Sequence, residues 1–167
     1  MFELKVLRRE AIPRALEKAE RYRLLNEPAQ AESICLDVLR IDPDDQQALV
    51  MLLLALTDQL DDGAAEYARK AREVLPRLHS EYERAYYAGI ICERQARAHL
   101  HRGAPRSGSI AYELFGEAMR AYEKAETIRP HGNDDAILRW NTCARVLMRD
   151  LRLAPRPEDT VEVLLLE

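Results

Sequence analysis

The feature that most constrains this chain is a pattern of four residues, separated by four, three and five positions, that occurs three times. In each copy a small residue is followed four and seven positions later by small, apolar or aromatic residues, and then by a proline. The copies are Ala31, Cys35, Val38 and Pro43; Ala64, Ala68, Ala71 and Pro76; and Ala118, Tyr122, Ala125 and Pro130. Residues so spaced share one face of an α-helix, and proline ends a helix. The shared spacing predicts a repeated helical unit.

The rest of the chain follows the helical period. Apolar residues recur at helical spacing in seven segments, which we expect to be helices. The segments cover about residues 12–22, 31–41, 46–60, 64–75, 80–100, 109–128 and 133–151. Pro13 suits a first helical turn, and Pro28 ends the helix before it. We expect a turn at residues 61–63, one long loop over residues 101–108, and an N-cap at Ser109. Short connections elsewhere favour antiparallel neighbours, so the sequence predicts an all-α chain of three hairpins and one unpaired helix.

The repeated spacing resembles the second helix of the tetratricopeptide repeat, and Ala19 and Tyr22 match small and tyrosine positions of that family's first helix. The resemblance implies a superhelix of about seven antiparallel helices in one domain over residues 1–153. Its repeats would cover about residues 12–45, 46–78 and 79–132, with a capping helix over 133–152 and an apolar tail over 154–167. Leu53 and Trp140 stand where the family has small residues. A helical bundle without repeats would explain each helix alone, but not the spacing they share.

In tetratricopeptide arrays the first helices line a concave groove that holds a peptide or helix of a partner protein. The resemblance places ten residues in that groove: Leu16, Glu20, Arg23, Val50, Leu54, Glu83, Tyr87, Arg94, Asn141 and Arg145. Val50 and Leu54 are equally consistent with a core, and Glu20 and Arg23 with a solvated face. Lysine stands only at positions 5, 18, 70 and 124, which disfavours the lysine-rich carboxylate clamp of chaperone-binding members. Apolar walls with a few arginines favour an amphipathic or extended apolar segment, or an acidic partner.

Composition and motifs argue against other classes of function. The net charge is −4, so we expect no general nucleic-acid surface, although Arg94, Arg97, Arg102 and Arg106 cluster after Tyr86 and Tyr87. His99 and His101 would converge on a metal only if their helix unwound there. Cys35, Cys92 and Cys143 lie on apolar faces and lack activating neighbours. Acidic pairs at 44–45, 61–62 and 134–135 suit helix starts. We therefore predict neither an enzyme nor a bound cofactor or metal.

The sequence thus predicts a protein-binding adaptor. The alternative is a self-assembling module, in which the apolar residues at 161 and 163–166 dock on the same chain or on a second copy as a homodimer. A simpler alternative is that this tail folds back on the last helix. The first ten residues contain no apolar run typical of a signal peptide, and the longest apolar run, 48–56, is shorter than the roughly 20 residues of a membrane helix. We expect a soluble, cytoplasmic protein with no membrane partner.

Overall fold

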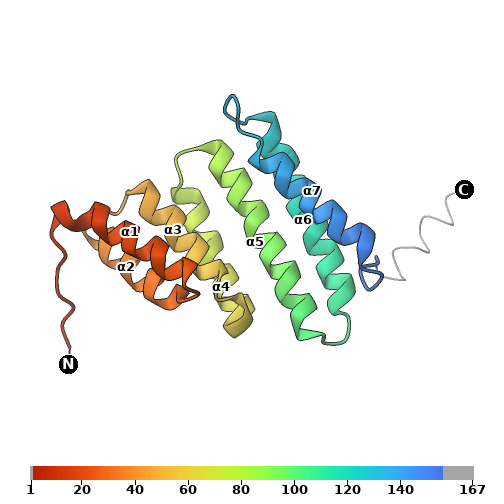
Figure 1. The fold of residues 1–167 in the computed structure, drawn as a ribbon, viewed down its shortest axis with the longest axis horizontal. Coiled ribbons are helices and arrows are strands. Elements are labelled where there is room, and N and C mark those ends of the chain that lie inside the picture. Colours follow the sequence, from red (N-terminus) through yellow and green to blue (C-terminus); the bar gives the residue numbers. More distant parts are fainter. Residues whose placement is uncertain (1, 156–167) are drawn as a thin grey trace, which may run out of the picture. The chain divides into compact units, whose positions relative to one another are not determined.

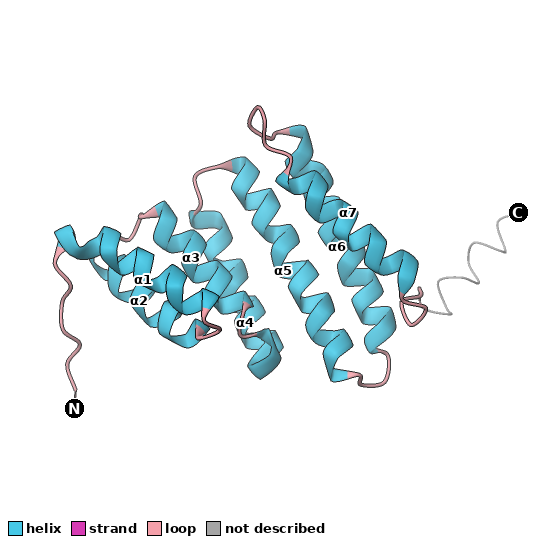
Figure 2. Ribbon diagram, viewed as in Figure 1, coloured by secondary structure: helices cyan, strands magenta, loops and turns pink. Residues whose placement is uncertain are grey.

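The protein is all-α. A computed structural model describes residues 2–155, without the side chains at 62 and 64. Over these residues the regular structure consists of seven α-helices and two short 3-10 helices, with no strand (Figures 1 and 2). The α-helices are α1 (Ile12–Leu24), α2 (Pro28–Ile41), α3 (Gln46–Thr57), α4 (Leu60–Val74), α5 (Glu81–Arg102), α6 (Ser107–Thr127) and α7 (Asp135–Arg149). The 3-10 helices are η1 (Arg9–Ala11) and η2 (Leu75–Arg77). The predicted helical class and helix number are confirmed for this part of the chain.

The helices form two compact units that divide between Ser80 and Glu81. In the N-terminal unit α1 packs on α2, α2 on α3 and α3 on α4, and α1 also contacts α3. In the C-terminal unit α6 packs against both α5 and α7. Within each unit, helices that follow one another are antiparallel, as their short connections predict. The division falls close to the predicted boundary between the second and third repeats.

Local chemistry explains most of the helix boundaries. Pro13 and Pro28 each stand in the first turn of a helix, where their missing N–H groups are not needed. Asn26 adopts a left-handed conformation with a φ of 59° and so turns the chain between α1 and α2. Asp45 caps α3 because its carboxylate accepts a hydrogen bond of 2.8 Å from the backbone N–H of Ala48. These predicted breaks are confirmed.

Three predicted boundaries are wrong. Residues 101–108 do not form a long loop, because α5 continues to Arg102 and α6 begins at Ser107. The short connection is closed by left-handed backbone at Gly103 and Arg106, with φ values of 60° and 67°. Ser109 is therefore inside α6, where its hydroxyl donates to the backbone oxygen of Arg106 at 3.1 Å. The turn expected at residues 61–63 is a kink within α4, where Gly63 departs from helical backbone.

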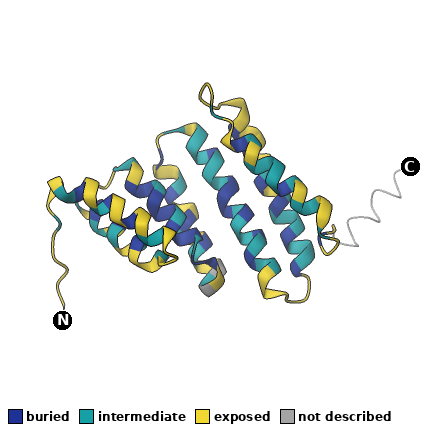
Figure 3. Cartoon of the chain, in the orientation of Figure 1, coloured by how far each residue is buried: buried dark blue, intermediate teal, exposed yellow. Residues whose placement is uncertain are grey.

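The repeated spacing marks the faces that pack. Wherever the side chains are described, its small and apolar members are buried (Figure 3). They are Ala31, Cys35, Val38, Ala68, Ala71, Ala118, Tyr122 and Ala125. Small side chains on these faces let neighbouring helices approach closely, which explains why the spacing recurs in α2, α4 and α6. Most of the predicted apolar tail lies outside the described residues, whose last buried side chain is Leu153.

Candidate functional site

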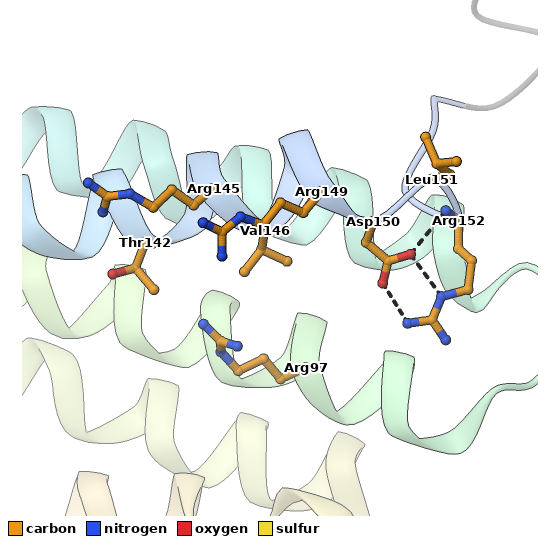
Figure 4. Close-up of a pocket in the computed structure, with 8 residues that line it drawn as sticks. All are labelled: Arg97, Thr142, Arg145, Val146, Arg149, Asp150, Leu151 and Arg152. Carbon is orange, nitrogen blue, oxygen red and sulfur yellow. Dashed lines mark hydrogen bonds and ion pairs between the residues drawn. The ribbon is translucent and has the colours of Figure 1, made fainter.

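A pocket rich in arginine opens in the C-terminal unit, between α5 and α7. Its volume is about 780 Å³. Its lining residues are Arg97, Thr142, Arg145, Val146, Arg149, Asp150, Leu151 and Arg152 (Figure 4). Four of these eight side chains are guanidinium groups and one is a carboxylate, so the lining is strongly positive although the chain as a whole is acidic. We call this site the arginine pocket.

The helical period of α7 builds one wall of the pocket. Thr142, Val146 and Arg149 follow one another at spacings of four and three residues and therefore share a face of the helix. Thr142 and Val146 point from α7 toward α5, and Arg97 extends from α5 into the space between the two helices (Figure 4). The pocket thus combines apolar surface from α7 with guanidinium groups from both helices.

A buried carboxylate holds Arg97 in place. Glu93 lies one turn before Arg97 on α5, and its side chain is only 2% exposed. Its Oε1 accepts hydrogen bonds from Arg97 Nη2 at 3.0 Å and from Arg139 Nη1 at 3.4 Å, and its Oε2 accepts one from the hydroxyl of Tyr122 at 2.8 Å. A buried charge is tolerated when it is paired and hydrogen-bonded in this way. We call these four residues, one on α6, one on α7 and two on α5, the Glu93 network.

The surroundings of Glu93 determine which groups keep their protons. Burial, followed by the charge of Glu93, raises the pKa of the Tyr122 phenol well above its usual range. The same two causes raise the pKa of the Cys143 thiol to about 12. Tyr122 therefore remains a hydrogen-bond donor to Glu93 at any ordinary pH. The guanidinium of Arg97 also lies 5.9 Å from the centre of the Phe115 ring, which further limits its movement.

Two other arginines of the pocket are available to a ligand. Arg145 and Arg149 are exposed on successive turns of α7, and no carboxylate within residues 2–155 pairs with either. Arg152 differs, because its Nε and Nη2 donate to the two carboxylate oxygens of Asp150 at 2.8 and 2.5 Å. These hydrogen bonds lower the pKa of Asp150 to about 2. Free guanidinium groups beside apolar surface suit a ligand that carries carboxylates and apolar side chains, because guanidinium binds carboxylate bidentately.

The predicted groove residues of the N-terminal unit are unequally accessible. Leu16 is 3% exposed and offers almost no surface to a partner. Arg23 is engaged, because its Nε donates to Asp58 at 2.6 Å and so ties α1 to the end of α3. Glu20 is exposed, whereas Val50 and Leu54 are half-buried.

The predicted groove residues of the C-terminal unit lie on α5 and α7, the two helices that form the arginine pocket. Glu83, Tyr87 and Arg94 are half-buried on α5, and Arg94 precedes Arg97 by about one turn. Asn141 is half-buried on α7, and Arg145 is exposed there and lines the pocket. The structure thus brings Arg145 together with Arg97, Arg149 and Arg152.

Sequence reasoning missed Glu93, Arg149 and Arg152. The sequence alone could have identified Arg149, because this residue follows Arg145 by four positions and so shares its helix face. Glu93 carried no such signal. A glutamate four residues before an arginine is the usual pattern of a solvated helix surface, and only the approach of Tyr122 and Arg139 shows that this one is buried.

Other candidate chemistry does not assemble in the described part of the chain. His99 and His101 both lie within α5, which stays helical to Arg102, so their side chains point apart. Within residues 2–155 no group of three or more His, Cys, Asp or Glu side chains is placed to hold a metal ion. Burial raises the pKa of the Cys35 thiol to about 12, which disfavours its reactive thiolate. Nor is any helix among the described residues long and apolar enough to cross a membrane.

Comparison of the chain with family models, with curated proteins and with solved structures finds no match in any of the three.

Proposed function

We propose that this chain is a protein-interaction adaptor whose arginine pocket binds an acidic segment of a partner protein. The observation that carries the proposal is the pair Arg145 and Arg149, exposed on one face of α7 with no carboxylate partner within residues 2–155. An exposed ion pair contributes only about 0.2–1 kcal/mol, so a measurable affinity also needs apolar contacts beside the two arginines. Val146 and Leu151 add apolar surface beside these charges.

The tetratricopeptide resemblance supports the same surface. In that family the first helix of each repeat lines the groove, and the resemblance assigns this role to α5 and the capping position to α7. The arginine pocket lies on these two helices. An acidic partner also agrees with the scarcity of lysine, because arginine rather than lysine would supply every contact with a carboxylate.

A protein partner fits the pocket better than a nucleic acid does. A nucleic-acid surface needs a broad field of positive charge, whereas this chain carries a net charge of −4 and its free arginines are local. Of the arginines that first suggested such a surface, Arg97 is neutralised by Glu93. The proposal assigns no catalytic step to the chain.

Charge reversal at α7 tests the proposal. The probe is a fluorescently labelled peptide of alternating Glu and Leu, titrated with the full chain at low salt and followed by anisotropy. We expect the R145E/R149E variant to bind at least about tenfold more weakly, because repulsion replaces two charge-assisted hydrogen bonds. Binding by the unaltered chain should also weaken as salt is added.

The matched control is R21E/R40E, which changes the net charge by the same amount at exposed positions of α1 and α2. This control should bind as the unaltered chain does. Equal loss of affinity in both variants would mean that overall charge, and not the arginine pocket, attracts the peptide. Unchanged affinity in R145E/R149E would overturn the proposal.

A further inference from the structure

We propose that the arginine pocket is occupied by residues 156–167 of the same chain, which a partner's acidic segment must displace. This inference rests on the proposed function, because it requires that the pocket accept acidic segments. If this segment competes for the pocket, the partner's affinity is reduced by the chain itself.

Charge complementarity is the first argument. After Arg156 the segment contains four acidic residues and no basic one: Glu158, Asp159, Glu162 and Glu167. The pocket presents Arg145 and Arg149 without carboxylate partners among residues 2–155. The segment also carries apolar side chains at positions 161 and 163–166, which match the apolar surface that Val146 and Leu151 expose in the pocket. Both the charged surface and the apolar surface of the pocket are therefore complementary to this segment.

The place where the chain leaves the C-terminal unit is the second argument. Asp150, Leu151 and Arg152 themselves line the pocket, so the chain leaves α7 along the pocket's rim. This exit is held in place: Leu153 is 7% exposed, and a Cβ built on Gly108 would lie 2.1 Å from the backbone oxygen of Arg152. The start of α6 thus packs closely on the turn after α7.

The length of the segment is the third argument. Twelve residues extend up to about 40 Å at roughly 3.3–3.6 Å each, whereas Arg145 and Arg149 lie only about 6 Å apart along α7. The segment can therefore return over both arginines without strain. A ligand on so short a tether has an effective concentration of about 1 mM, so an intrinsic Kd of about 0.1 mM is enough to weaken a competing ligand roughly tenfold. This short path favours the chain's own segment over that of a second copy.

The test neutralises the acids of the segment in the full chain. Three proteins are compared: the unaltered chain, the E158Q/D159N/E162Q variant, and that variant with R145E/R149E added. Two labelled probes are titrated into each by anisotropy, a peptide of residues 156–167 and the Glu-Leu peptide. We expect the neutralised variant to bind both probes about tenfold more tightly than the unaltered chain, and the added arginine changes to remove that binding. Far-UV circular dichroism checks that the three proteins keep the same helix content.

The alternative results separate this inference from the proposed function. If both probes bind the unaltered and neutralised chains equally, the pocket is already open and self-occupation is overturned, while the adaptor proposal stands. If the Glu-Leu peptide binds the neutralised chain but the 156–167 peptide does not, this segment is not the occupant. If neither probe binds the neutralised chain, both proposals fail. Light scattering that shows a dimer of the unaltered chain, lost on neutralisation, would assign the segment to a second copy and overturn occupation within one chain.

Discussion

At Gly89 helix α5 packs closely against Tyr122 of α6, and Gly89→Ala should destabilise the C-terminal unit. A Cβ at position 89 of α5 would lie 2.4, 2.7 and 2.9 Å from three ring carbons of Tyr122 on α6. The ring cannot easily withdraw. Tyr122 is fully buried, its hydroxyl donates to Glu93 at 2.8 Å, and the ring of Tyr86 lies 5.8 Å away, centre to centre. The added methyl group must therefore displace α5, the ring, or both.

Two opposing effects set the size of the loss. Alanine is favoured over glycine in a helix interior by about 1 kcal/mol. Overpacking of a well-packed core costs typically about 1–3 kcal/mol, and contacts this short with a tethered ring belong at the upper end of that range. The difference predicts that Gly89→Ala lowers the free energy of unfolding by about 2 kcal/mol, despite its better helix propensity.

Tryptophan fluorescence can measure this loss in the unit where it occurs. The chain contains one tryptophan, Trp140, which lies on α7 and donates a hydrogen bond of 2.9 Å to Glu123. Its emission during urea unfolding therefore reports on the C-terminal unit. With a denaturant dependence of about 1–3 kcal/mol per molar urea, a loss of 2 kcal/mol lowers the midpoint by about 1 M.

Gly116→Ala is the matched control on α6. A Cβ there would meet only the Nη1 of Arg120, at an ordinary 3.6 Å, so the helix preference for alanine should raise stability by about 0.5–1 kcal/mol. The two identical substitutions are thus expected to have opposite signs. If Gly89→Ala were as stable as the unaltered chain, or more stable, the close packing of α5 on Tyr122 would be refuted.

Three further predictions concern the network, the cysteines and a helix cap. Glu93→Ala should destabilise the C-terminal unit by about 2–4 kcal/mol in the same fluorescence assay, because it leaves the buried Tyr122 hydroxyl without an acceptor; a loss below about 0.5 kcal/mol would contradict the network. Cys35 and Cys143, with pKa values raised to about 12, should stay unmodified by iodoacetamide at pH 8 until urea unfolds the chain, as judged by mass spectrometry. Asp45→Ala should lower stability by about 1 kcal/mol, measured by circular dichroism, because it removes the hydrogen bond that caps α3.

Sequence reasoning predicted the helices well where a single residue determines the local backbone. The first turn expected at Pro13, the break expected at Pro28 and the helix start expected at the acidic pair 44–45 all depend only on near neighbours in the chain. The prediction was wrong over residues 101–108, because the connection needs only two left-handed residues, Gly103 and Arg106. An arginine in that conformation has no sequence signal.

The candidate site was less predictable than the fold. The family resemblance predicts a binding role for Arg145, and that role stays a prediction. The structure shows that Arg145 lines the arginine pocket. The pocket itself depends on α5 and α7 lying near each other, and on Asp150 and Arg152 closing one end. These are distances between elements far apart in the chain, which a spacing pattern does not contain.

What the sequence by itself determined is the all-α class, the number of helices and the faces on which they pack, because helical period, small residues and prolines act locally. What only the tertiary structure decided is the chemical state of particular side chains. Glu93 has the sequence context of a surface residue, yet it is buried because Tyr122, Arg97 and Arg139 supply its hydrogen bonds from three helices. Arg97 is paired with Glu93, whereas no described carboxylate reaches Arg145 or Arg149. The charge of these two arginines therefore stays available to a ligand.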